Sequence, residues 1–140
     1  MKELTYQETI EQYGMFIYFP VGTSMLPLIR EGKDSVKLVK IERPVKQHDV
    51  VLYQRNDQFI LHRVVKVKDD TVDMAGDHQT MIEKDVLKSS IIALMEGVYR
   101  EERYVPIQSF RMKCYSATRP MVRFLRKCRA KLARLIRRKV

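Results

Sequence analysis

The sequence has few of the residues that build disulfide frameworks, metal sites and membrane spans. It has two cysteines in 140 residues, Cys114 and Cys128, and both lie near the C-terminus. Their number and placement argue against a disulfide framework and against a four-ligand zinc site. No apolar run approaches the roughly 20 residues that cross a bilayer, and the polar, acidic start at 1–14 is unlike a signal peptide. We therefore expect an intracellular, reduced, globular protein.

Acidic side chains are absent from residues 119–140, which include ten Lys and Arg residues. The chain has 27 basic and 17 acidic residues, so removing these ten leaves 17 of each sign in residues 1–118. The body is therefore neutral, and the net charge of +10 lies in the tail. This distribution indicates a separate cationic appendage rather than a basic face on the domain.

Long helical patterns are absent between residues 15 and 99, where short apolar runs alternate with turn sequences. Before them, residues 3–13 of the segment 1–14 predict a short helix that Gly14 ends. Alternations such as Val36-Lys37-Leu38 and Val65-Lys66-Val67 are typical of half-buried strands. We predict a mainly β domain over 15–99, a connector over 100–118, and strands at 15–21, 35–41, 49–54, 59–67, 71–75 and 90–99.

The tail 119–140 predicts a basic amphipathic helix that begins at Pro120, since proline at a helix start loses no hydrogen bond. Its apolar residues recur at spacings of three and four: Met121, Phe124, Leu125, Cys128, Leu132, Leu135 and Ile136. Such a helix suits an anionic membrane surface. The alternatives are a groove on a partner protein, nucleic-acid phosphates, or packing of the stripe on the β domain. Nucleic acid is less favoured, because one aromatic residue provides little base stacking.

Ser24 lies in a segment suited to acyl transfer, Phe19-Pro20-Val21-Gly22-Thr23-Ser24-Met25-Leu26-Pro27. Gly22 gives a tight backbone after a strand, and such a turn presents a hydroxyl and backbone N–H groups to one point. A nucleophile beside backbone donors is the minimum for acyl transfer, because the donors hold the developing oxyanion. The alternative is that the segment is only a turn.

Two further segments supply groups that a serine nucleophile needs. His62 lies in the apolar run 59–65, which predicts a strand that would hold the imidazole rigidly as a general base with a pKa near ~6.5. The rate would then fall as the pH drops through that value. Asp77 follows Gly76 in a turn and would orient the imidazole. Taken singly, these segments are better explained as a strand histidine without a catalytic role and an ordinary Gly-Asp turn.

Taken together, four segments resemble the signal peptidase I family, serine peptidases that share a fold with LexA-type self-cleaving repressors. The similarity is to the nucleophile motif, to the strand after it, to the base motif with His in place of the bacterial Lys, and to the last motif. The matching segments are Gly22-x-Ser24-Met25-x-Pro27, Asp49-Val50-Val51-Leu52-Tyr53, His62-Arg63-Val64 and Gly76-Asp77. The resemblance covers about residues 15–97 and implies the family's coiled β-sheet fold.

The resemblance implies a serine endopeptidase that needs no metal or cofactor and cleaves a leader or signal-like peptide. Ser24 would be the nucleophile, and His62 the general base that later protonates the leaving amine. Asp77 would orient His62, or else Glu83 or Asp85 would do so.

The resemblance also implies where the substrate binds. The Ser24 N–H with Gly22 would form the oxyanion hole, Met25 would line the substrate site, and the substrate would pair as an added strand with residues 15–21. The chain departs from the family at Gly22, where many relatives have serine, and at His48, where glycine is common.

No hydrophobic anchor precedes the serine motif in this sequence. We therefore expect a cytoplasmic member, peripheral at the inner membrane face, that acts on a peptide or protein substrate. One rival is a self-processing or DNA-associated regulator of the same fold, although no helix-turn-helix region precedes the motifs. The other rival is a catalytically silent peptide-binding module.

Overall fold

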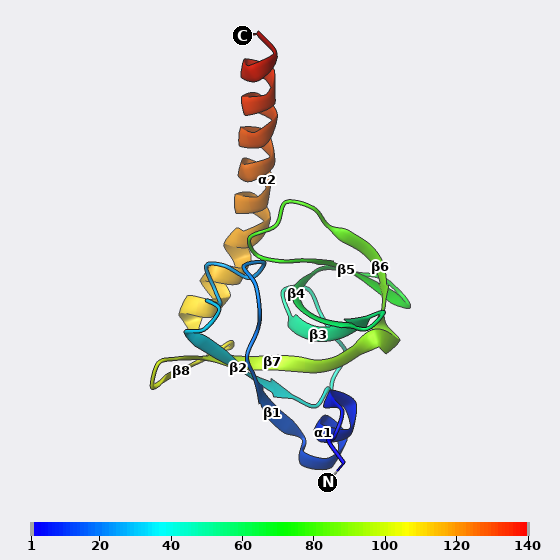
Figure 1. The fold of residues 1–140 in the computed structure, drawn as a ribbon. Coiled ribbons are helices and arrows are strands. Elements are labelled where there is room, and N and C mark those ends of the chain that lie inside the picture. Colours follow the sequence, from blue (N-terminus) through cyan, green and yellow to red (C-terminus); the bar gives the residue numbers. More distant parts are fainter. Residues whose placement is uncertain (1, 140) are drawn as a thin grey trace.

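The structure, a computed structural model that describes residues 2–139, contains an eight-stranded antiparallel sheet between an N-terminal and a C-terminal helix (Figure 1). This confirms the prediction of a mainly β domain with a helix at each end. The helical elements are α1 (Tyr6–Tyr13), the short 3-10 turn η1 (Lys88–Ser90) and α2 (Phe110–Lys139). The strands are β1 (Met15–Tyr18), β2 (Asp34–Val39), β3 (Val50–Arg55), β4 (Gln58–Val67), β5 (Thr71–Ala75), β6 (Glu83–Leu87), β7 (Ile91–Arg100) and β8 (Arg103–Pro106).

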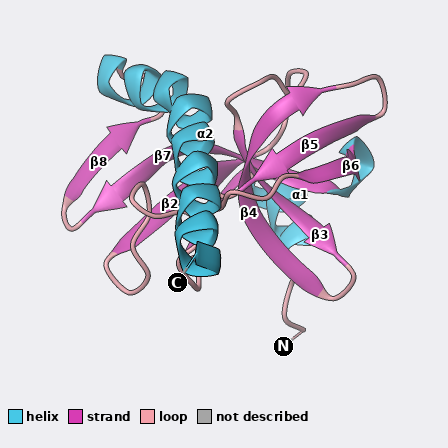
Figure 2. Cartoon of the chain, turned by 90° about the horizontal axis from the view of Figure 1, so that it is seen from above, coloured by secondary structure: helices cyan, strands magenta, loops and turns pink. Residues whose placement is uncertain are grey.

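Strand β7 joins two groups of strands into one sheet. The order across the sheet is β1-β2-β7-β3-β4-β5-β6, and β8 also pairs with β7. Leu94 of β7 lies opposite both Val39 of β2 and Val51 of β3, so the strand passes from one group of partners to the other. Figure 2 shows β2, β7 and β8 on one side of α2 and β3 to β6 on the other.

Strand β3 lies between two apolar clusters. Val50 and Leu52 belong to the larger cluster, which also contains Ile10 of α1, whereas Val51 and Tyr53 belong to the smaller one. Successive side chains of a strand point to opposite faces, so a sheet that coils around β3 buries both of its faces. The four side chains are therefore fully buried, and β3 forms a rigid base beside the histidine strand β4.

Helix α1 forms where its local signals predict. Thr5 caps it in a capping box with Glu8, and Gly14 ends it with a left-handed φ of 74°. Its Tyr6 stacks on Phe16 of β1 and meets Phe59 of β4 edge to face, with ring centroids 5.3 and 4.8 Å apart. The helix thus packs, through Tyr6, against residues at the start of β1 and of β4.

The six predicted strands are present, but two further strands, β6 and β8, were not predicted. Val86 is the one buried residue of β6, and β8 has none, so neither carries a strong apolar pattern. The predicted alternation at Val65 and Val67 is also wrong. A register shift between Val64 and Lys66 interrupts it, and Val67 is exposed.

Helix α2 begins ten residues earlier than predicted, at Phe110 rather than Pro120. Ser109 precedes the helix, and its Oγ accepts a hydrogen bond from the Met112 N–H at 3.4 Å. Pro120 therefore lies inside the helix, where it lacks the N–H that would bond the Ser116 carbonyl. The helix bends between its first turns and its distal part (Figure 2). Most of the predicted connector 100–118 is thus β8 and the start of α2.

Candidate active site

Ser24 lies in the loop between β1 and β2, with its neighbours anchored in the core. Met25, Leu28 and Ile29 are buried in the larger apolar cluster, which fixes the loop on the sheet. Gly22 takes a φ of 93°, a conformation that L side chains rarely adopt. The loop therefore holds Ser24, half-buried, at the surface of the core.

The turn after β5 holds the serine loop from the other side. The His78 N–H donates to the Ser24 carbonyl at 2.9 Å. Gly76 packs so close to the same carbonyl that an added Cβ would lie 2.4 Å from its oxygen. The Gly76-Asp77 segment thus contacts the Ser24 segment directly, as two parts of one site.

His62 on β4 faces Ser24. Its Nε2 lies 3.3 Å from the Ser24 Oγ, and the ring is 8% exposed. This is slightly longer than an ordinary hydrogen bond, and such distances are common in catalytic pairs before substrate binds. The structure therefore brings together Ser24 and His62, which are 38 positions apart in the sequence.

Tyr53 and Glu83 fix the proton position on the imidazole. The Tyr53 hydroxyl lies 2.7 Å from Glu83 Oε2 and 3.4 Å from His62 Nδ1. A carboxylate only accepts, so Tyr53 donates its single proton to Glu83, and its oxygen accepts the Nδ1–H of His62. The other nitrogen, Nε2, is then unprotonated and directed at the Ser24 hydroxyl. This is the tautomer that a general base requires.

Burial makes the imidazole a weaker base than the sequence predicts. Desolvation lowers the pKa of His62 to about 4, with Glu83 and Asp77 opposing the shift and Arg55 adding to it. The value expected from sequence, near ~6.5, belongs to an exposed imidazole. His62 is therefore neutral, and able to accept a proton, over the whole physiological range.

The acylation rate of Ser24 by a serine-directed reagent is expected to be level from about pH 8 to pH 5 and to halve at about pH 4. Protonation of Nε2 removes the base, so the rate falls toward acid.

His62 also makes the protein less stable as the pH drops from about 6.5 to 4, since the unfolded chain binds the proton more readily there. Intact mass against time gives the first profile and urea unfolding the second. A rate that halves near 6.5 would contradict the burial of His62.

Replacement of Tyr53 by phenylalanine is expected to lower the acylation rate about ten-fold, because Nδ1–H loses its acceptor and the tautomer is no longer fixed. Glu83→Gln removes a charge that raises the pKa of His62, so the acid limb of the pH profile moves to lower pH. Tyr104→Phe is the matched control, since its hydroxyl contacts Glu96 on the β7–β8 side of the sheet. If Tyr53→Phe reacted as fast as Tyr104→Phe, or Glu83→Gln left the acid limb where it is, the roles given to Tyr53 and Glu83 would be wrong.

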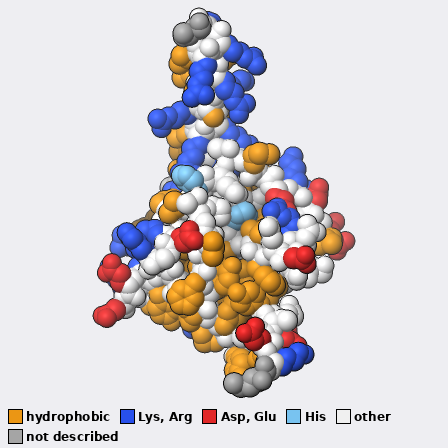
Figure 3. All heavy atoms as spheres, viewed as in Figure 1, with side chains coloured by type: hydrophobic (Ala, Val, Ile, Leu, Met, Phe, Trp, Pro, Cys, Tyr) orange, Lys and Arg blue, Asp and Glu red, His pale blue; other side chains and the backbone are white. Residues whose placement is uncertain are grey.

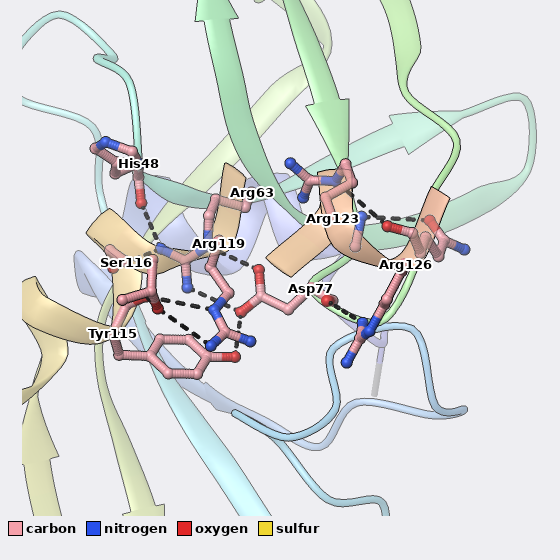
Figure 4. A network of polar contacts seen from close by, with 11 residues as sticks. His48, Arg63, Asp77, Tyr115, Ser116, Arg119, Arg123 and Arg126 are labelled. Carbon is pink, nitrogen blue, oxygen red and sulfur yellow. Dashed lines mark hydrogen bonds and ion pairs between the residues drawn. The ribbon is translucent and has the colours of Figure 1, made fainter. Parts of the chain in front are cut away.

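Asp77 does not orient His62, contrary to the prediction. Its carboxylate accepts two hydrogen bonds from the Arg63 guanidinium, at 2.7 and 3.0 Å, and one from the Tyr115 hydroxyl at 2.7 Å (Figure 4). Arg63 follows His62 on β4, so its side chain leaves the opposite face of the strand. A carboxylate paired with Arg63 is thereby directed away from the imidazole. Of the alternatives, Asp85 pairs with Lys68, and Glu83 reaches His62 through Tyr53.

The Asp77–Arg63 pair belongs to a network that ties α2 to the site. Arg63 also donates to the His48 carbonyl and to Ser116 of α2, and Arg126 of α2 donates to the Asp77 carbonyl at 2.9 Å (Figure 4). The sequence signal for this network is a charged residue, Arg63, within an apolar strand. Such a residue, 2% exposed here, requires a buried partner.

A groove runs past Ser24 and His62, and both polar and apolar residues line it. Gly22, predicted beside the oxyanion hole, and Met25, predicted in the substrate site, both line it. Other lining residues are Tyr18, Val21, Phe59, Leu61 and Arg55. A peptide segment, with backbone amides and apolar side chains, can contact such a mixed surface.

Among residues 2–139, no group of three or more His, Cys, Asp or Glu side chains could hold a metal ion. No helix of that range has the length and hydropathy to cross a membrane. Comparisons with protein-family models and with curated proteins found no match for this chain. The assignment of a function therefore rests on the geometry of Ser24, His62 and their surroundings.

Proposed function

We propose that this protein is a serine endopeptidase, with Ser24 as nucleophile and His62 as general base. The observation that carries the proposal is the 3.3 Å contact of Ser24 Oγ with Nε2 of a buried histidine whose Nδ1 lies 3.4 Å from the Tyr53 hydroxyl. A histidine with only a structural role would not be expected to contact a serine hydroxyl through one ring nitrogen and, through Tyr53, the Glu83 carboxylate on the side of the other. This arrangement is that of nucleophile, base and orienting group in acyl transfer.

The chemistry follows from these positions. Ser24 Oγ attacks the carbonyl carbon of a peptide bond while its proton passes to His62 Nε2. The Ser24 N–H, which pairs with no acceptor among the described residues, is a donor for the resulting oxyanion. The C–N bond then breaks as Nε2–H protonates the leaving amine. Water attacks the acyl-serine, gives its proton to Nε2, and releases the second product as Ser24 recovers its hydrogen.

The proposal includes the relationship to signal peptidase I and the LexA-type fold. All four resembling segments contribute to one region: the serine loop, the start of β3, the histidine strand β4 and the Gly76-Asp77 turn. The departure at His48 is also informative, since its φ of 77° is the left-handed conformation that glycine takes readily. The backbone at His48 is therefore compatible with a Gly-Asp motif although the side chain differs, and this supports the proposed relationship.

The substrate is an extended, leader-like or signal-like peptide segment. The strand β1 is at the edge of the sheet, and Tyr18 at its end lines the groove beside Ser24. A free strand edge can pair with an added strand through backbone hydrogen bonds. Such pairing requires an extended substrate, but it depends little on the substrate's sequence. Apolar residues of the lining, such as Val21, Phe59 and Leu61, can contact uncharged side chains near the scissile bond.

Cleavage of a diverse mixture of synthetic peptides, read by mass spectrometry, tests the proposal. We expect new termini with the wild-type chain and none with Ser24→Ala, whose shape is the same apart from the hydroxyl. Cleavage that persists in Ser24→Ala would contradict the proposal. Two further readouts separate the rivals. Self-cleavage, followed by the intact mass of the protein alone over days, would favour a self-processing regulator. A Ser24 that does not react with a serine-directed acylating reagent would favour a peptide-binding module.

A further inference from the structure

The distal part of α2 stands away from the body and carries an uncovered apolar stripe. Figure 1 shows the helix projecting beyond the sheet, and Figure 3 shows hydrophobic side chains among cationic ones along it. The stripe consists of exposed residues: Met121, Phe124, Leu125, Leu132, Leu135 and Ile136. Exposed apolar side chains that line up at helical spacing indicate a contact with something else.

The stripe does not pack on the β domain, because the helix uses its other side for that contact. Arg123 is buried, and Arg123 and Arg126 donate to the carbonyls of Gln79 and Asp77. At about 100° per residue, Leu132 and Ile136 lie within about 60° of the direction opposite to Arg123. The face that holds the body and the face that carries the stripe are therefore opposite sides of one helix.

Charge selects the kind of surface that covers the stripe. Residues 119–140 have ten basic and no acidic side chains. A second copy of the helix would bring like charges together, which opposes pairing through the stripe. Nucleic acid would neutralise the charges but leave the apolar side chains uncovered. A bilayer with anionic lipids satisfies both, since the stripe enters the acyl boundary while the cations contact the headgroups.

We propose that the distal part of α2 docks on an anionic membrane surface through this stripe. The docked helix lies in the plane of the bilayer with its body-binding face toward water, so the β domain sits on the aqueous side without rearrangement. Because Arg126 binds the turn that contacts Ser24, the serine site is attached to the base of the membrane-bound helix. This inference is independent of the peptidase proposal.

A single tryptophan reports insertion directly, because the chain has none of its own. In the full chain, Phe124→Trp is mixed with vesicles of phosphatidylcholine alone or with about 30% phosphatidylglycerol. We expect a blue shift of the emission with the anionic vesicles only, and a weaker one as salt is raised. Emission that does not change with anionic vesicles, or that changes equally with neutral ones, would overturn the proposal.

Sedimentation with the same vesicles tests the stripe itself. Leu132→Ala/Leu135→Ala/Ile136→Ala keeps helix propensity and charge but removes apolar surface, and we expect its partition to anionic vesicles to fall at least ten-fold. The matched control is Ala130→Ser/Ala133→Ser, on the side away from the stripe, which should bind as the wild type does. Binding that the alanine variant retains would mean adsorption by charge alone and would overturn docking through the stripe.

Discussion

Replacement of His62 by alanine is expected to lower the acylation rate of Ser24 by about 10²–10⁴-fold, the usual contribution of a positioned general base. A serine hydroxyl is a weak nucleophile until a neighbouring group takes its proton, and among the described residues His62 Nε2, at 3.3 Å, is the base that contacts it. The rate is measured by intact mass after mixing with a serine-directed acylating reagent. The loss should be equal at every pH above about 5, because the wild-type base is fully unprotonated there.

His78→Ala is the matched control for this prediction. The His78 side chain is exposed, and its contact with the Ser24 loop is made by its backbone N–H, which the substitution leaves in place. It should acylate at the wild-type rate. If His62→Ala reacted as fast as His78→Ala, Ser24 would not depend on an imidazole, and the assignment of His62 as base would be wrong.

Replacement of Asp77 by alanine is expected to cost about 3–5 kcal/mol of unfolding free energy, through the burial of an uncompensated charge rather than through loss of a catalytic group. The Arg63 guanidinium is 2% exposed and would retain no carboxylate partner. The Tyr115 hydroxyl would also lose its acceptor. Urea unfolding of the two proteins under the same conditions measures the difference.

A double variant separates the buried charge from general disruption. In Arg63→Met/Asp77→Leu both charges are gone. The double variant should therefore lose much less unfolding free energy than the sum of the losses in Arg63→Met and Asp77→Leu. Lys40→Ala breaks an exposed ion pair with Glu11 and serves as the control with little expected effect. An Asp77→Ala protein as stable as the wild type would contradict the role of the Arg63–Asp77 pair.

The sequence was informative where one short segment determined the local structure. Thr5 and Gly14 mark the ends of α1, and alternating apolar residues place β2. The two residues that meet in the site, Ser24 and His62, could be selected because each stands in a motif with a characteristic order. Strands with few buried residues, β6 and β8, and a helix that continues through Pro120, carry no such local signal.

The partners of the site residues could not be read from the sequence, because they depend on which faces of distant strands meet. Asp77 has the residue type and position expected of an orienting carboxylate. It pairs instead with Arg63, because successive side chains of β4 point to opposite faces and Asp77 lies on the Arg63 face. Glu83 reaches His62 only because Tyr53 of β3 lies between them. The low pKa of His62 likewise follows from burial by neighbouring strands, which no local pattern reports.

The most direct test of the account is the reaction of the full chain with a fluorophosphonate, read by intact mass and peptide mapping, with Ser24→Ala beside it. Activated serines react with such reagents, whereas ordinary serines do not. We predict a single adduct on Ser24 in the wild type and none in Ser24→Ala. No adduct at any pH between about 5 and 9, where His62 is neutral, or an adduct that Ser24→Ala retains, would contradict the assignment of Ser24 and His62 as nucleophile and base.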